Sequence, residues 1–556
     1  MNHGINITEN STATRAMNQI ESGIVVAIGT APIASEKPVL AYTYAEFVNQ
    51  LGYSEDFDKY TLCEIGQAVF NLYGMCPAVF INVFDPSKHF EEVEKTFEGV
   101  TEFSLESEAQ IDTLKVTSGE KIEPTQLIKD TDFIVDKMYL HGADNDPVAA
   151  IEFLNLDKIV DGKFKVTYRM TREALGGEPT VEEVQVEELE DNIWELTDDT
   201  ILESVTVESG GVDTLVELDC TVETGGGVAQ VTILDAAAVV DNKISVSYKK
   251  ADATLVTAAD IIGGIDAATG AATGLALVDS IYPKWNLIPG ILIAPKFSTD
   301  VAVITALTRK AKSISDVFSG VAICDIPTSC KTYSQAVEWK NENNLSDSHL
   351  ILTYPKVLAE GKQYHLSTHL AALMNRVDYS NDSVPYQSPS NQGLEISAAV
   401  LDDGTEVFFN QSTANFMNAN GIVTVFTFGN GLRAWGNYTS AYPATNDVKD
   451  IFIPVRRMFD FLSAMLLTNY ISNLDVPIVR RQVDSILQSC NLYLASLTSR
   501  QMLLGGDLTF NEADNSTSDL MAGKITFRLN YCPPVPAQNI QFILEYDSSY
   551  YANLFQ

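Results

Sequence analysis

Acidic charge is concentrated in the middle third of this 556-residue chain, and that contrast limits how the chain can fold. Residues 91–280 contain 41 acidic and 13 basic side chains, a net charge of −28 within a total of −38. A charge of this sign disfavours nonspecific nucleic-acid binding, because the phosphate backbone repels it. The middle third therefore has a different kind of surface from the rest of the chain.

An α/β pattern precedes the acidic region. Residues 23–30 and 78–84 are continuous apolar runs of strand length, typical of buried strands. Between them, residues 44–51 and 62–73 have the apolar spacing of helices. The chain therefore begins, after its first twenty or so residues, as an α/β protein.

The same pattern resumes after the acidic region. Residues 91–255 read as short alternating strands with acidic runs and glycine turns. After an Ala/Gly-rich connector at 261–274, a strand at 290–295 and an amphipathic helix at 299–317 follow. The chain length predicts about three or four domains or inserted modules. We interpret the acidic region as an insertion into a loop of one α/β core, in preference to three domains in series.

Ten residues of the acidic region recur within it. The sequence VDGKFKVTYR at 160–169 returns as VDNKISVSYK at 240–249. Two copies of one small β-unit explain this match, and so does a common type of hairpin.

Two helices are predicted late in the core, at 454–471 and 477–497, each with a proline near its first turn and an apolar stripe. Each also carries an arginine pair near its start, where cations are unfavourable. Asp460 and Asp484 lie four residues after the first arginine of each pair, so pairing within the helix is one interpretation. An anionic partner in an assembly is the other. The four arginines are Arg456, Arg457, Arg480 and Arg481.

Strand-like segments occur at both ends of the chain. They are residues 4–9, 524–531 and, beyond a Cys-Pro-Pro-Val-Pro break, 540–546. Alternating strands need an edge to pair with, which is supplied either by the same subunit or by another copy.

The segment GNGLRAWGNYTS at 429–440 has the glycine spacing of a nucleotide-binding turn. No amphipathic helix follows it to stabilise a phosphate, and the lysine of a phosphate loop is absent. We therefore interpret the segment as a strand-turn-strand in which glycines make room for a buried Trp435.

Catalytic and metal-binding patterns are weak throughout. His365 and His369 stand one helical turn apart, but the glutamate of a zinc-protease motif is missing and no third ligand is evident. There is no G-x-S-x-G motif, and the seven cysteines include no C-x-x-C pair, as expected of reduced thiols in a bacterial cytoplasm. We expect no catalytic site, cofactor or metal, and, without a run of 18 apolar residues, no membrane insertion.

Several motifs in order resemble one known family, the tail sheath proteins of contractile phages and related injection particles such as tailocins. The motifs are residues 4–9 with 23–32, ADIIGGIDAATG at 259–270 with TGL at 273–275 and PGILIAP at 289–295, NANGIVT at 418–424, RAWG at 433–436 with Thr439, and 525–542. They span both ends of the chain. The acidic region is longer than a minimal sheath protein needs, so the resemblance does not extend to it.

The resemblance implies an α/β (α+β) sheath core with a mixed sheet and flanking helices, an inserted acidic β-rich domain, and extended N- and C-terminal arms. The expected divisions are an N-terminal arm at 1–20, a core at 21–90 plus 281–530, an outer insertion at 91–280, and a C-terminal arm at 531–556. Trp435 becomes a packing residue of that core.

For function, the resemblance implies a helical homopolymer of stacked, hexameric rings around an inner tail tube protein, with baseplate and tail-terminator proteins as further partners. Each subunit lends its terminal strands to neighbours, and contraction from a metastable extended state drives the tube through a cell envelope. The particle is a virion tail or an extracellular contractile particle assembled in the bacterial host cytoplasm. The residues expected to bind neighbours are Ile5, Ile7, Ile540, Phe542 and Leu544, and the four arginines are candidates for facing the tube or a neighbour.

Two other functions remain open on the sequence. A nucleotide-dependent α/β enzyme requires a complete phosphate loop, and a monomeric acidic β-rich surface-binding protein requires an export signal.

Overall fold

The computed structural model divides the chain into two compact units. The first unit comprises Met1–Val26, Ala68–Ala78 and Val278–Gln556, and the second comprises Ala27–Gln67 and Val79–Leu277. The structure describes residues 17, 20–98, 243–267, 269–427, 429 and 431–555, together with strands placed between 102 and 233.

A sheet forms the centre of the first unit. Its strands β18 (Ile291–Ile293), β19 (Val321–Asp325), β20 (Leu350–Thr353) and β24 (Ile422–Thr427) are parallel neighbours in that order. Strand β25 (Leu432–Trp435) follows antiparallel to β24, so the sheet is mixed. Every residue of β18, β19 and β20 is buried, because these short apolar runs are covered on both faces.

Helices connect these strands. Helix α5 (Val301–Lys312) begins where the Asp300 carboxylate accepts the Ala302 N–H at 2.7 Å. It ends at Lys312, before the predicted 317, because Ser315 and Asp316 have positive φ angles of 50° and 60°. The other helices between β18 and β25, or just before them, are α4 (Ile281–Trp285), α6 (Tyr333–Glu342), α7 (Leu366–Ser380) and α8 (Gln411–Asn418). A small antiparallel sheet joins β21 (Lys356–Ala359), β22 (Lys362–Tyr364) and β23 (Ala398–Val400).

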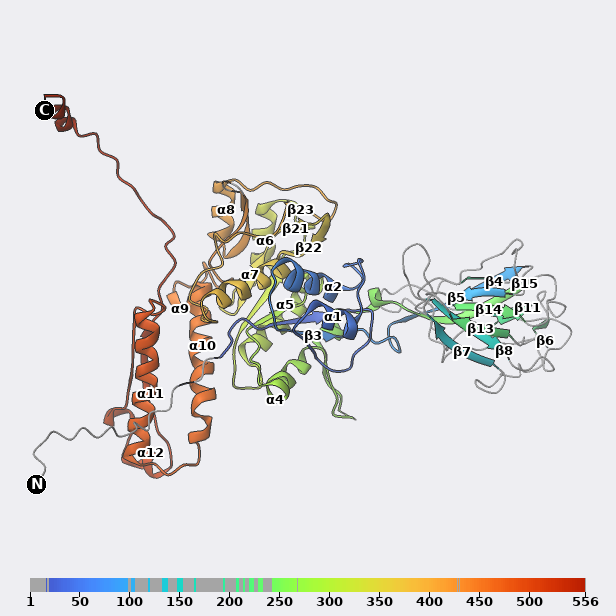
Figure 1. Ribbon diagram of the computed structural model, residues 1–556, viewed down its shortest axis with the longest axis horizontal. Helices are drawn as coiled ribbons and strands as arrows, with labels where there is room; N and C mark the ends of the chain where they lie inside the picture. The colour runs from blue at the N-terminus through green and yellow to red at the C-terminus, as the bar shows by residue number, and fades with distance from the viewer. Residues whose placement is uncertain are drawn as a thin grey trace, which may run out of the picture. The chain divides into compact units, whose positions relative to one another are not determined.

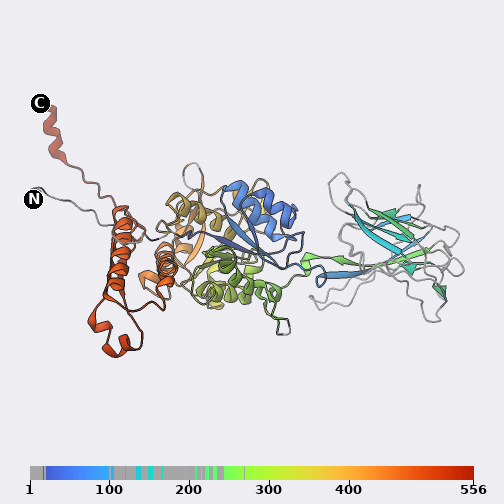
Figure 2. The ribbon, with the colours of Figure 1, turned by 60° about the horizontal axis from the view of Figure 1, so that its bottom comes forward.

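The last part of the first unit is a pair of long helices, α10 (Ile453–Tyr470) and α11 (Arg480–Ser499), which lie side by side in both views (Figures 1 and 2). Pro454 lies in the first turn of α10, as predicted. Helix α11 instead begins three residues after Pro477, so that part of the prediction is wrong. The neighbouring elements are α9 (Val448–Ile451), β26 (Gly505–Thr509), α12 (Thr517–Met521) and β27 (Arg528–Cys532), and β26 pairs antiparallel with β27.

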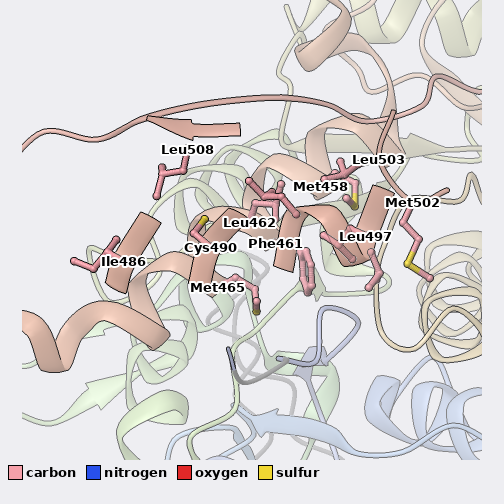
Figure 3. Close-up of a cluster of buried hydrophobic side chains, with 12 residues drawn as sticks. Met458, Phe461, Leu462, Met465, Ile486, Cys490, Leu497, Met502, Leu503 and Leu508 are labelled. Carbon is pink, nitrogen blue, oxygen red and sulfur yellow. The ribbon is translucent and has the colours of Figure 1, made fainter. Parts of the chain in front are cut away.

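A separate apolar cluster holds the helix pair to β26 (Figure 3). The apolar stripes of α10 and α11 meet there at helical spacing, and Leu508 adds a side chain from β26. Met17 and Ile20, from the N-terminal segment, pack against the same cluster. Its buried members are Val384, Met458, Phe461, Leu462, Met465, Ile486, Cys490, Leu494, Leu497, Met502, Leu503 and Leu508.

The second unit contains the predicted N-terminal α/β elements. Strands β1 (Val25–Gly29) and β3 (Ala78–Asn82) begin in the first unit and continue into this one, and both are fully buried. Helix α1 (Tyr44–Leu51) matches its predicted bounds. The second predicted helix is divided into α2 (Thr61–Gly66) and a π-helical turn over Gln67–Leu72. The remaining elements are β2 (Val39–Ala41), α3 (Ala258–Ile262), β16 (Gly264–Ile265) and β17 (Ala272–Thr273).

A long strand pair lies at the start of the acidic region and near its end. Strand β4 (Phe90–Glu98) runs antiparallel to β15 (Lys243–Ala251), from Phe90 opposite Ala251 to Glu98 opposite Lys243. The described parts of the two recurring segments, in β9 and β15, belong to one sheet, ordered β4-β15-β11-β9. The strands placed between β4 and β15 are β5 (Glu102–Leu105), β6 (Gly119–Glu120), β7 (Phe133–Met138), β8 (Val148–Phe153), β9 (Lys165–Val166), β10 (Trp194–Glu195), β11 (Val207–Ser209), β12 (Thr214–Leu215), β13 (Cys220–Thr224) and β14 (Ala229–Ile233).

The predicted fold class of the core is confirmed: a mixed sheet with flanking helices forms the α/β core.

Candidate assembly site

The C-terminal arm leaves β27 as an extended segment with no helix or strand over residues 533–547 (Figure 1). Its first residues include Pro533, Pro534 and Pro536, which cannot donate ladder hydrogen bonds and favour an extended backbone. Four side chains further on are apolar and exposed: Ile540 at 70%, Phe542 at 83%, Ile543 at 76% and Leu544 at 94%. Ile540, Phe542 and Leu544 form an apolar row at strand spacing, and Ile543 interrupts the alternation.

The predicted strand at 540–546 does not form within this chain. A lone segment has no edge on which to make ladder hydrogen bonds, although its alternation is that of a strand. The other predicted strand of this region, at 524–531, is β27, and it pairs with β26 of the same chain. For that segment, pairing within the subunit is the correct alternative.

The root of the C-terminal arm is held at Gln538. Its Oε1 accepts a hydrogen bond from the Tyr438 hydroxyl at 2.7 Å, and its Nε2 donates to Asn437 Oδ1 at 2.8 Å. The Tyr438 ring is fixed in turn by stacking on Tyr442, with centroids 4.0 Å apart, and on Phe452, with centroids 5.1 Å apart. Gln538 therefore holds the arm just before its exposed apolar row begins. We call this point the root of the C-terminal arm.

The segment 429–440 is the predicted strand-turn-strand, since β24 and β25 flank the turn. Trp435 is half-buried, so it is less buried than predicted. Its ring lies 4.9 Å from that of Phe426, and its Nε1–H donates to Asn415 Oδ1 at 3.0 Å. An indole that keeps a polar partner at the surface packs without being enclosed. Asn437 and Tyr438, late in this segment, hold the C-terminal arm. This contact was not predicted from the sequence.

The N-terminal arm enters the core at Ser22. Its Oγ donates to the Ser383 carbonyl at 2.7 Å and to Asp378 Oδ2 at 3.2 Å. The predicted neighbour-binding residues Ile5 and Ile7 lie outside the described residues.

The arginines of α10 point into the first unit. Arg457 is 4% exposed and forms an ion pair with Asp378, itself 2% exposed, so the prediction that it faces a tube or a neighbour is wrong. Arg456 is 14% exposed and pairs with Asp460 at 2.9 Å and Asp450 at 3.5 Å. For Arg456 the interpretation of pairing within the helix is correct.

The arginines of α11 remain at the surface. Arg480 is 87% exposed and pairs with Asp484 four residues later, at 2.9 Å, and Arg481 is also exposed. The loop that precedes them carries further exposed apolar side chains: Ile471, Leu474, Val476, Ile478 and Val479. Two cations beside an apolar loop make this end of the helix pair a candidate contact surface.

Strands β26 and β27 offer an acceptor for an added strand. They form a sheet of only two strands, and β27 alternates between exposed and half-buried residues. A two-stranded ribbon is marginal by itself and gains stability from each strand that joins its edge. Strand β26, with the sequence GGDLT, was not predicted, because its glycines weaken the strand signal.

The described residues lack the arrangement of a metal site: no group of three or more potential metal ligands occurs among them. His369 is fully buried and its Nδ1 lies 3.1 Å from the Tyr73 hydroxyl, and burial lowers the pKa of its imidazole to about 3. His365 immediately precedes α7. No described helix has the length and hydropathy needed to cross a bilayer.

Comparison with known proteins gives two informative relatives, although no protein-family model matches the chain. The tail sheath protein of Burkholderia phage BcepMu is 32% identical over 329 residues, covering 55% of this chain and 65% of that protein. The major tail sheath protein of Serratia phage KSP20 is 26% identical over 303 residues, covering 53% of this chain and 72% of that protein. The predicted resemblance to tail sheath proteins is therefore confirmed.

The chain spans just under two thirds of the length of the BcepMu protein that it matches. Among solved structures, it is similar to the helical sheath of the anti-feeding prophage in its contracted state, with a TM-score of 0.48 and 11% identity over 98% of both chains.

Proposed function

We propose that the protein is a structural subunit of a contractile tail sheath. Subunits polymerise helically around an inner tail tube, and they move from a metastable extended lattice to a contracted one that drives the tube through a target envelope. The phage relatives named as tail sheath proteins support this proposal. The role is mechanical and non-enzymatic, and the extended lattice persists because the barrier to contraction is high.

The apolar row of the C-terminal arm carries the proposal. Ile540, Phe542 and Leu544 are 70%, 83% and 94% exposed, whereas soluble chains bury such side chains when they can. A neighbouring copy buries them by taking the arm as an added strand on its β26–β27 ribbon. At about 0.5–1.5 kcal/mol net per hydrogen bond, a strand of about five residues contributes a few kcal/mol before side-chain packing.

Such a contact joins unlike surfaces of two copies, so it can repeat from copy to copy and build an open helical polymer. In the polymer that we propose, the subunits are arranged as stacked, hexameric rings. Arg480 and Arg481, beside the apolar loop, are our candidates for facing the inner tube. Baseplate and tail-terminator proteins complete the list of partners. The assembly is part of a virion tail or an extracellular contractile particle, and it forms in the cytoplasm of the bacterial host.

Electron microscopy of the purified protein tests this proposal. The full chain is expected to form tubes unaided, and a chain ending at residue 539 is expected to remain dispersed, with an unchanged unfolding midpoint. The Asn539→Asp variant is a matched control, because it adds charge to the arm outside the apolar row, and it should still form tubes. Tubes formed by the shortened chain would overturn the proposal.

A nucleotide-dependent enzyme would bind ATP in solution, and a surface-binding protein would remain monomeric at every concentration. Both outcomes are measurable on the same preparation, by ATP titration and by analytical ultracentrifugation.

A further inference from the structure

Residues that hold the two arms contact successive turns at the start of one helix. Helix α10 begins at Ile453, next to the residues that hold the C-terminal arm, and Arg457 in its second turn contacts the residues that hold the N-terminal arm. Residues 453 and 457 are separated by about 6 Å along a helix axis.

The contacts of the C-terminal root lead directly to the start of α10. Gln538 bonds to Asn437 and Tyr438 through its side chain. The Asn437 carbonyl accepts the Ile453 N–H at 3.0 Å, and Tyr438 stacks on Phe452 at 5.1 Å. A displacement of the Gln538 side chain therefore reaches the start of α10 through Asn437 and Tyr438.

The contacts of the N-terminal root lead to the next turn. Arg457 Nη1 donates to Asp378 Oδ1 at 3.0 Å, and its Nη2 donates to Asp378 Oδ2 and, at 3.5 Å, to the Ser22 carbonyl. The Ser22 carbonyl lies close to the backbone of Gly290, where only glycine fits, because an added Cβ would lie 1.9 Å from the Ser22 carbonyl oxygen. The backbone at Ser22 is thus fixed on more than one side.

We propose that Gln538 and Ser22 are positioning residues for the two arms, and that the start of α10 couples them. The inference rests on the proposed function, since it assigns the path by which a pull on one arm reaches the other arm of the same subunit. A hydrogen-bonded helical turn resists stretching, and a buried charge pair cannot separate without leaving a charge unpaired.

Hydrogen exchange measured on assembled tubes tests the coupling. Gln538→Ala removes the hydrogen bonds with Asn437 and Tyr438. Asn539→Ala, at the next residue of the same arm, is the control. Exchange in Gln538→Ala tubes is expected to rise about fivefold over residues 453–457 and 20–24, the change expected from losing about one hydrogen bond's stabilisation. Asn539→Ala tubes are expected to exchange at wild-type rates in both stretches.

The reciprocal variant, Ser22→Ala, is expected to raise exchange at 437–439 and 453–457. Faster exchange confined to the mutated root in both variants would overturn the coupling while leaving strand donation intact. Absence of tubes from the wild-type chain would instead overturn the proposed function, so the two failures are distinguishable. Unfolding midpoints of the dispersed variants check that the fold is unchanged.

Discussion

Helices α10 and α11 begin with the same pattern, Arg-Arg-x-x-Asp, and the two arginine pairs have different environments. In both helices the first arginine pairs with the aspartate four residues later, at 2.9 Å. Arg456 is 14% exposed and Arg480 is 87% exposed, while Arg457 is buried against Asp378 and Arg481 is exposed. Sequence spacing thus determines the pair within the helix, and the surrounding structure determines what each arginine contributes.

The largest difference is expected between the second arginines. Arg457→Met leaves the buried Asp378 carboxylate without its partner, and we expect a loss of about 3–5 kcal/mol of unfolding free energy. Arg481→Met changes an exposed side chain and should cost less than about 0.5 kcal/mol. Urea denaturation of the unassembled variants measures both, and equal losses would contradict the comparison.

Lys340 sharpens the comparison. It is as buried as Arg457, but its hydrogen-bond partners are neutral carbonyls and not a carboxylate. Its Nζ donates to the carbonyls of Asn420 and Tyr442, and burial lowers its pKa from 10.5 to about 8. Between these values the unfolded chain binds a proton that the folded chain has lost, so stability should rise as pH increases from about 8 to 10.5. The expected total is roughly 3 kcal/mol.

The control for this pH effect is Lys340→Met, compared with wild type across the same pH series. Only the difference between the two curves of stability against pH reports on Lys340, because tyrosines and cysteines titrate in the same pH range. Parallel curves would show that the folded and unfolded states hold this proton equally well.

A smaller difference is expected between the first arginines. Arg456→Gln removes contacts with Asp460 and Asp450 at a half-buried site, and we expect a loss of about 1–2 kcal/mol. Arg480→Gln removes an exposed pair and should cost about 0.3–0.5 kcal/mol. Thermal unfolding distinguishes them, and a larger effect at Arg480 would reverse the ranking.

The last comparison concerns the proposed tube contact and uses the double variant Arg480→Glu/Arg481→Glu, which changes only exposed side chains. If these arginines face the tube, the variant should fold normally and fail to co-sediment with purified tube protein. Wild-type co-sedimentation would exclude them from that contact.

Strands and helices with a clear apolar period could be predicted from the sequence. The runs that became β1, β3 and β18, and the stripes of α1 and α10, are local signals, so their positions agree closely with the structure. Helix α11 begins late because Pro477 to Val479 remain extended before it, and a proline marks a helix start only to within a few residues.

Features that depend on distant residues could not be predicted. The partner of Arg457 is Asp378, 79 residues away, and the partner of Gln538 is Asn437, 101 residues away. Neither separation leaves a local signal. The alternation at 540–546 was recognised correctly, but whether it forms a strand depends on an edge that one chain does not supply.

The pairing of β4 with β15 has an engineering consequence. Residue 90 lies opposite residue 251, so the chain enters and leaves this part of the acidic region on two paired, neighbouring strands. We expect that the residues between β4 and β15 can be replaced by foreign sequences of different length, because the two strands would still bring the chain ends together. If the subunits polymerise as proposed, a domain grafted between these strands would be displayed once per subunit along the polymer.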